Sequence, residues 1–261
     1  MLYLIFLLVC FFASVIGAIC GIGGGVIIKP VLDAFGVMDA AQISFLSGCT
    51  VLSMTTYSVL KSKVKGESHI QKSTGFPLAL GAAFGGIAGK LLFSYVKSIS
   101  SDIDKVGQIQ AACLLTVTLG TLIYTICKSR IKTLHIEKAS ACLIIGLVLG
   151  ILSAFLGIGG GPINLVVLFF FFSMPTKTAA ENSLYIIFFS QLASLVLSLI
   201  NGEAFRAELP VLLLMIAGGI GGGIVGRALN KRIREATVDK LFIGLMTIII
   251  VINIYNIYRF S

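Results

Sequence analysis

The chain contains few charged residues for its length. Charged residues make up 12% of its 261 residues, hydrophobic residues make up 57%, and the mean hydropathy is +1.04. A soluble domain carries roughly 25% charged residues. The polar groups are too few to cover the surface of a folded protein in water. The composition therefore excludes an ordinary soluble protein and predicts a protein surrounded by lipid.

The sequence also lacks the motifs of common enzyme classes. It has only two histidines, His69 and His135, and both fall in basic stretches. It contains no His-Glu-x-x-His pattern, no Gly-x-Ser-x-Gly nucleophile elbow and no nucleotide-phosphate loop, which excludes an ATP-driven pump for this chain alone. The six cysteines form no Cys-x-x-Cys pair, so we interpret them as small buried hydrophobes. We therefore predict no catalytic residue, no metal site and no cofactor.

Eight apolar segments are each about long enough to cross a bilayer, which takes about 20 residues. No Lys or Arg precedes Lys29, so we expect the first segment to be a mature helix rather than a secretory signal. The net charge of +9 is typical of basic cytoplasmic loops and does not indicate a nucleic-acid partner. The sequence thus predicts an all-α, multi-pass protein of the cell membrane. The segments are Leu2–Cys20, Ala40–Leu60, Thr74–Val96, Val106–Cys127, Ala139–Leu156, Thr178–Ile200, Leu209–Leu229 and Val238–Tyr258.

The same glycine-rich sequence occurs twice in the chain. Residues 21–25 read Gly-Ile-Gly-Gly-Gly, and residues 157–161 repeat these five letters. Further along, Gly85–Lys90 matches Gly222–Arg227 at nearly the same offset. Ordered matches of this kind indicate a duplicated unit. We predict two transmembrane repeats of four apolar segments within one membrane domain, residues 1–132 and 133–261.

The basic residues bear on whether the repeats are parallel or inverted. If all eight segments cross once, the 20 Lys and Arg residues divide equally between the two faces. If the first segment of each repeat breaks at its glycine run and returns through a short arm, Val26–Gly36 or Pro162–Ser173, fourteen of them share one face. Basic residues concentrate on the cytoplasmic side. We therefore favour inverted repeats, each with a broken, re-entrant-like first helix, over eight plain crossings.

The glycine runs indicate unwound backbone inside the membrane. An interior Gly costs a helix about 1 kcal/mol relative to Ala, and unwound backbone is tolerated at membrane depth only beside a cavity or within protein. Each break creates a helix N-terminus whose N–H groups attract anions. We predict a mid-membrane anion site whose donors are the backbone N–H groups of Val26–Ile28 and Ile163–Asn164; close helix packing is the alternative. The assigned residues are Gly21, Gly23, Gly24, Gly25, Val26, Gly157, Gly159, Gly160, Gly161 and Asn164.

Small polar residues follow each break and are further candidates for substrate binding, because hydroxyls and amides donate to oxyanion oxygens. Hydrogen bonding between helices is the alternative explanation. Glu181 is a candidate for proton coupling, although we favour an interfacial pair with Lys177, four residues earlier. We interpret Lys90 and Arg227, at equivalent places in the repeats, as snorkelling to the nearer interface. The polar candidates are Ser44, Ser47, Asn182 and Ser183.

These features resemble the sulfite exporter TauE/SafE family of membrane permeases, in which each half carries such a glycine break. Residues 175–184, Pro-Thr-Lys-Thr-Ala-Ala-Glu-Asn-Ser-Leu, are similar to the family's Pro…Ala-x-x-Thr-Ser-Leu stretch, with Asn182 where Thr is usual. Residues 41–46 match more loosely. The resemblance implies a secondary transporter for a small sulfur-containing anion such as sulfite, thiosulfate or an organosulfonate. An accessory membrane subunit and a membrane-embedded enzyme are the alternatives. The sequence gives no oligomeric state.

Overall fold

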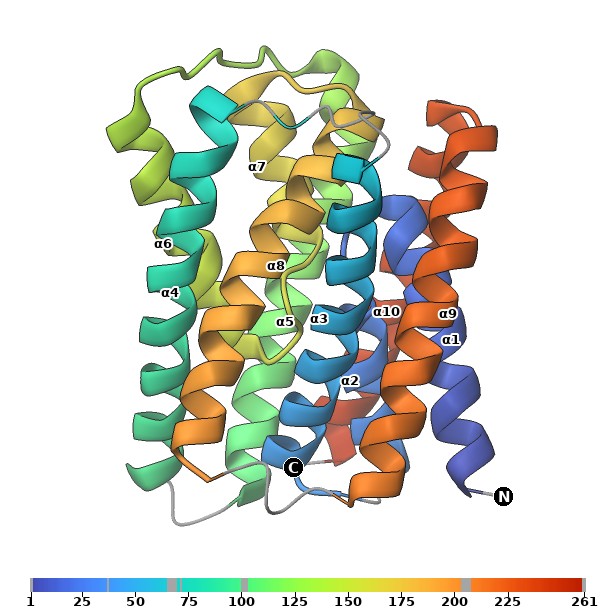
Figure 1. The fold of residues 1–261 in the computed structure, drawn as a ribbon. Helices are drawn as coiled ribbons and strands as arrows, with labels where there is room; N and C mark the ends of the chain where they lie inside the picture. Colours follow the sequence, from blue (N-terminus) through green and yellow to red (C-terminus); the bar gives the residue numbers. More distant parts are fainter. Residues whose placement is uncertain are drawn as a thin grey trace.

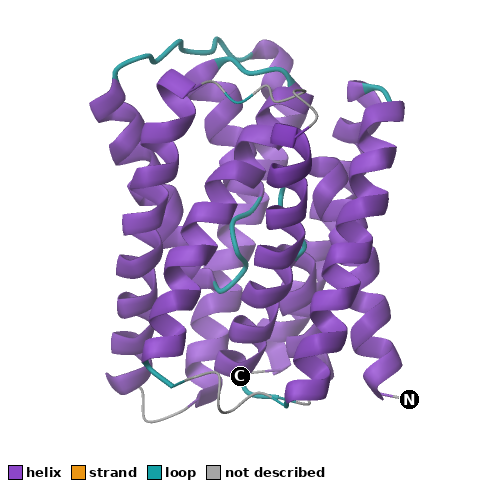
Figure 2. Ribbon diagram, viewed as in Figure 1, coloured by secondary structure: helices purple, strands orange, loops and turns teal. Residues whose placement is uncertain are grey.

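The computed structural model describes residues 2–36, 38–64, 70, 72–99, 103–202 and 208–259, and every regular element in these residues is helical. Eight of the helices are long and apolar enough to cross a membrane, which confirms the predicted all-α, multi-pass architecture. They stand side by side in one bundle, with both chain ends at the same end of it (Figures 1 and 2). The long helices are α1 (Leu2–Cys20), α3 (Ala40–Val64), α4 (Lys72–Ile99), α5 (Ile103–Cys127), α6 (Ala139–Leu156), α8 (Thr176–Ile200), α9 (Leu209–Arg232) and α10 (Glu235–Arg259).

The long helices extend beyond the predicted apolar segments at their charged ends. Helix α3 continues from Leu60 to Val64, and α9 continues from Leu229 to Arg232. Long basic side chains reach the headgroup region while their backbone stays helical, so the apolar run underestimates the length of a helix. Helices α1 and α6 have the predicted bounds.

Two short helices, α2 (Gly25–Phe35) and α7 (Pro162–Phe172), follow α1 and α6 directly after the glycine runs. Each has 11 residues, about 16 Å of helix, which cannot cross a hydrocarbon core of about 30 Å. Helix α2 lies toward the end of the bundle that holds the chain termini, whereas α7 lies toward the opposite end (Figure 1).

Helical glycines fix the relative directions of the long helices. Residues Gly81–Gly89 of α4 lie against Leu143–Ile151 of α6 in the same order, so these helices run parallel. In the same way, Gly218–Gly226 of α9 lie against Leu7–Val15 of α1. The packing is close: a Cβ added to Gly85 would lie 2.1 Å from the Leu147 carbonyl oxygen. Small residues at these positions allow the backbones to touch.

Helix α3 runs parallel to α9 and antiparallel to α8. Helix α4 runs parallel to α8, since Gly75 lies near Asn182 and Gly86 lies against Ser190. Consequently α1, α3 and α9 run one way, and α4, α6 and α8 run the other. Helices at equivalent places in the two halves therefore point in opposite directions, as an inverted arrangement requires. Which end of the bundle is cytoplasmic stays a prediction, and much of the basic loop 61–72 lies outside the described residues. The deciding contacts are Thr50 with Gly219 and Met54 with Gly223 for α3 and α9, and Gly48 with Leu195 and Ser62 with Glu181 for α3 and α8.

The C-terminal ends of both short helices are capped by other parts of the chain. The extended segment 131–138 lies along α7, where the N–H of Leu134 donates to the Phe170 carbonyl at 2.7 Å. At α2, Nη1 of Arg259 donates to the carbonyls of Asp33 and Ala34. Carbonyls at a helix end have no partner within the helix, so these contacts hold each short helix in place.

Candidate functional site: the two glycine breaks

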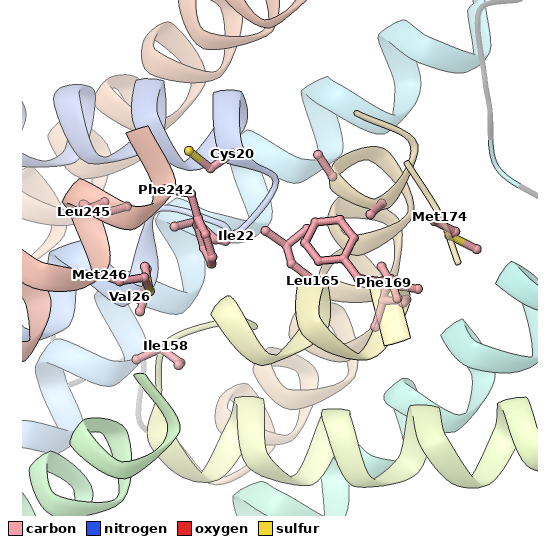
Figure 3. Packing of buried hydrophobic residues seen from close by; sticks show 14 of the residues in the cluster. Cys20, Ile22, Val26, Ile158, Leu165, Phe169, Met174, Phe242, Leu245 and Met246 are labelled. Atoms are coloured by element: carbon pink, nitrogen blue, oxygen red, sulfur yellow. The ribbon is translucent and has the colours of Figure 1, made fainter. Parts of the chain in front are cut away.

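The two glycine breaks lie against each other inside the bundle. A Cβ added to Gly25 would lie 2.0 Å from the carbonyl oxygen of Ile158, and one added to Gly23 would lie 3.6 Å from that of Gly159. Figure 3 shows Val26 and Ile158, from α2 and the second break, in one cluster of buried apolar side chains. The structure therefore brings together the two runs that the sequence assigned to a single site.

The two breaks share a backbone conformation. Gly21 and Gly157, which open the runs, have φ of 77° and 66°. Gly23 and Gly159 have φ of 70° and 72°. Glycine adopts this left-handed region without the penalty that a Cβ imposes. The matching letters of the two runs thus encode matching turns. Gly160, with φ of 108°, departs from Gly24, which is in the right-handed helical region.

Each break packs against a helix of the opposite half. The position of a Cβ on Gly21 is 2.2 Å from Cα of Ala180 in α8, and that of Gly157 is 2.4 Å from Oγ of Ser44 in α3. Two turns further along these helices, side chains of Val51 and Ile187 contact the glycines at the centre of the breaks. Helices α3 and α8 therefore enclose both breaks from two sides.

Two buried hydroxyls lie on the enclosing faces. Ser47 is one turn beyond Ser44 in α3, and Ser183 is one turn beyond Ala180 in α8, so each shares a face with residues that touch the breaks. Both side chains are 0% exposed, and neither Oγ has a hydrogen-bond partner in the described part of the chain. An unpaired buried polar group costs about 1–3 kcal/mol, and such a group calls for an explanation such as a ligand or a water.

The N-termini of α2 and α7 offer free donors, although not all of those predicted. The N–H groups of Ile27 and Ile28 both donate to the Gly24 carbonyl at 3.0 Å, and that of Asn164 donates to the Gly161 carbonyl at 3.1 Å. The prediction that these three amides face a ligand is therefore wrong, because they close the first turn of their helices.

Three other amides are available. The N–H groups of Gly25, Val26 and Ile163 donate to no other atom among the described residues. The side-chain oxygen of Asn164, a residue only 1% exposed, also lacks a partner there. Unpaired amides at two helix N-termini are the kind of donor set that binds an anion.

Asn182 is not brought to the breaks. It lies on the side of α8 that faces α4, where a Cβ on Gly75 would be 3.4 Å from its Oδ1. Its Nδ2 donates to the carbonyl of Thr178 at 2.9 Å. Consecutive helical residues point in different directions, so Asn182 and Ser183 cannot serve the same face.

A cavity of about 390 Å³ opens beside the first break, where Ala18 and Ala180 belong to its wall. Three basic residues also line it, Lys177, Arg227 and Lys231, together with Glu181. A second cavity, of about 440 Å³, is lined by residues at the starts and ends of helices at the opposite end of the bundle, among them Gln42 and Lys97. The glycines of the two breaks line neither of these two cavities.

An apolar cluster separates the first cavity from the breaks. Ala18 and Leu184 belong both to the cavity wall and to this cluster, which continues to the side chains that touch the glycines. The breaks are therefore closed off from this cavity, and close packing accounts for part of the need for glycine. The cluster consists of Ala18, Val51, Met54, Leu184 and Ile187.

Glu181 accepts a hydrogen bond from Oγ of Ser62, which links α8 to α3 at the wall of the first cavity. Lys177 lines the same cavity, so proton coupling and ion pairing both remain predictions for Glu181. The snorkelling interpretation is wrong for Lys90, which is 4% exposed and whose Nζ lies 5.4 Å from the centre of the Phe93 ring. Arg227 lines the cavity and donates to the carbonyl of Ser58 at 2.6 Å.

Sequence reasoning missed an ion pair in the first short helix. Nζ of Lys29 lies 2.9 Å from Oδ2 of Asp33, and the two side chains are 2% and 8% exposed. The signal was present: a Lys and an Asp four residues apart lie within the apolar arm, and charges inside a membrane segment mark functional sites by default.

The model of one protein family matches most of the chain. The family is described as Sulfite exporter TauE/SafE, and the match spans residues 6–252. The chain belongs to this family. It is also 24% identical, over 277 residues, to the Probable membrane transporter protein YunE of Bacillus subtilis (strain 168), covering 99% of this chain and 98% of that protein. No solved structure matches significantly. These findings confirm the resemblance drawn from the sequence and identify a TauE/SafE membrane transporter.

Proposed function

We propose that this TauE/SafE transporter carries a small sulfur-containing anion, such as sulfite, thiosulfate or an organosulfonate, bound between its two glycine breaks. The observation that carries the proposal is the contact between the two glycine breaks, each of which leads into a helix N-terminus with free amides, beside the unpartnered hydroxyls of Ser47 and Ser183. All of these groups can donate hydrogen bonds, as the oxygens of a sulfur oxyanion require.

The electrostatics favour an anion over a cation. Each helix N-terminus stabilises a negative charge by about 0.3–1 kcal/mol when exposed and up to about 2 kcal/mol when partly buried. The glycine runs carry no acidic side chain. In the first cavity, three basic residues outnumber the single carboxylate of Glu181. A cavity lined mainly by one sign of charge concentrates the opposite ion, which supports a role as the entrance.

Alternating access fits the arrangement of the cavities. The two cavities are lined from opposite ends of the bundle, and the apolar cluster of Ala18, Val51, Met54, Leu184 and Ile187 closes the route from the first cavity to the breaks. Transporters with inverted repeats expose a central site to one face at a time by rocking one repeat against the other. Opening this cluster would deliver the anion from the first cavity to the breaks, while the route from the second cavity stays closed.

Uptake into proteoliposomes tests the proposal. We expect saturable uptake of labelled sulfite, thiosulfate or methanesulfonate, with competition among them, and no uptake of a neutral solute such as glycerol. Gly160→Val is the inactive control, because its Cβ would lie 2.1 Å from Cγ1 of Ile187 at a φ that side chains rarely adopt. Folded protein that transports none of these anions, or that carries the neutral solute equally well, would contradict the proposal.

A further inference from the structure

Helix α2 contains an ion pair that the membrane should penalise. Lys29 and Asp33 are almost fully buried, at 2% and 8% exposure, in a helix whose other residues are mostly apolar. Taking two charges into a low-dielectric interior costs several kcal/mol for each ion, and apolar residues of similar size are often at least as stabilising. The pair therefore needs an explanation other than stability.

The fold does not require the pair. Helix α7 occupies the equivalent place in the second half, after the same glycine run, and the residues at the corresponding positions are Leu165 and Phe169. These are 2% and 7% exposed and belong to the main apolar core. The same architecture is thus built with apolar residues in one half and with a charge pair in the other, which makes the charges specific to the first half.

Lys29 lies beside the candidate site. Its Cδ, two bonds from Nζ, is 3.5 Å from the position a Cβ would take on Gly157, the first glycine of the second break. Oγ of Ser44 is 2.4 Å from the same position. Lys29 is also only one turn into α2 from Gly25, where the free amides begin. Rotation about its side-chain bonds is the movement that would redirect the ammonium from Asp33 toward the breaks.

Lys29 and Asp33 depend on each other. Among the described residues, Lys29 is the sole hydrogen-bond partner of the Asp33 carboxylate, whose Oδ1 remains unpaired, and Asp33 is the sole partner of the Lys29 ammonium. The nearby polar residues of α10 do not compete for either side chain, because Arg259 and Asn256 donate to backbone carbonyls of α2. An anion at the breaks would therefore meet a single competitor for Lys29.

We propose that Lys29 is the charge that recognises the transported anion, and that Asp33 neutralises it while the site is empty. The incoming oxyanion displaces the Asp33 carboxylate from Nζ of Lys29, and Asp33 takes the ammonium back when the anion leaves. Because binding must break the resident pair, Asp33 lowers the affinity and thereby permits release. This inference rests on the proposed function of the glycine breaks.

We expect removal of the Asp33 charge to strengthen anion binding and removal of the Lys29 charge to weaken it. Asp33→Asn removes the competitor and should lower the Kd for thiosulfate about tenfold or more, equivalent to about 1.4 kcal/mol. Lys29→Met alone would strand a buried carboxylate, so the informative variant is Lys29→Met with Asp33→Asn, which carries no charge. This double variant should fold as well as the wild type and bind thiosulfate at least about tenfold more weakly.

The matched control is the Lys128–Asp239 pair, with Nζ and Oδ2 2.6 Å apart and side chains 29% and 24% exposed. Lys128→Met with Asp239→Asn should leave the Kd unchanged. Thiosulfate and sulfite binding would be measured by calorimetry on purified protein, alongside the KM for uptake. If the wild type neither binds nor transports these anions, the proposed function fails and this inference with it. If it does, and neither the tighter Kd of Asp33→Asn nor the weaker Kd of the double variant appears, the pair is structural and only this inference is overturned.

Discussion

A single methyl group at Gly25 tests whether contact between the two breaks matters. Gly25 is the first residue of α2 and has no left-handed φ, so Ala is acceptable to the backbone there. Its Cβ would nevertheless lie 2.0 Å from the carbonyl oxygen and 2.6 Å from the carbonyl carbon of Ile158. Backbone atoms cannot rotate out of the way as a side chain can. The two breaks must therefore move apart in Gly25→Ala.

The expected loss of stability in Gly25→Ala is the difference between two opposing contributions. Overpacking a well-packed interior costs about 1–3 kcal/mol, whereas replacing Gly by Ala gains a helix up to about 1 kcal/mol. The net destabilisation of up to about 2 kcal/mol lowers the melting temperature by about 2–4 °C per kcal/mol for a chain of this size. A separation of the donors that costs the transport step about 1.4 kcal/mol reduces the rate about tenfold.

The assay compares Gly25→Ala with Gly120→Ala and Gly244→Ala, where an added Cβ meets no atom within 4 Å. Melting in detergent and thiosulfate uptake into proteoliposomes are measured for all three variants. We expect the two controls to melt at or above the wild-type temperature and to transport normally. If Gly25→Ala matches the controls in both measurements, the reasoning from contact between the breaks is refuted.

Three further predictions concern the site and the topology. Asn164→Ala should raise the KM for thiosulfate several-fold, by about 1 kcal/mol, with little change in melting temperature because its side-chain oxygen has no partner in the described structure; a large loss of stability with unchanged KM would make the residue structural. If Glu181 carries the coupled proton, Glu181→Gln should abolish uptake driven by a pH gradient but preserve anion exchange; unchanged pH dependence would leave Glu181 only a pairing role. Cysteines introduced at Ser68 and Thr237, in a background without accessible native cysteines, should be labelled from the cytoplasmic face in both cases, whereas labelling from opposite faces would exclude the inverted arrangement.

Much of the fold could be predicted because lipid imposes a simple rule on the sequence. Apolar runs marked the long helices, and the ends of α1 and α6 were predicted to the residue. The breaks after α1 and α6 could also be predicted, since four glycines in a run of five residues cannot continue a helix at low cost. The polar end of α9, residues 230–232, was missed because its side chains are polar although its backbone is helical.

The interior of the site was harder to predict because it depends on which side of each helix faces the breaks. Asn182 and Ser183 are adjacent in α8, but the side chain of Asn182 lies toward α4, whereas Ser183 lies on the face that encloses the breaks. The individual free amides could not be identified either, because the first turn of α2 uses those of Ile27 and Ile28. The Lys29–Asp33 pair was not predicted, although two opposite charges four residues apart in an apolar arm are close enough on a helix to pair.

A structure of the protein saturated with thiosulfate tests the central claim most directly. The account predicts one anion between the breaks, within hydrogen-bonding distance of the amides of Gly25 or Val26 and of Ile163, and beside the hydroxyls of Ser47 and Ser183. Thiosulfate bound only in the cavity lined by Lys177 and Lys231, with the breaks still in contact and closed, would contradict it.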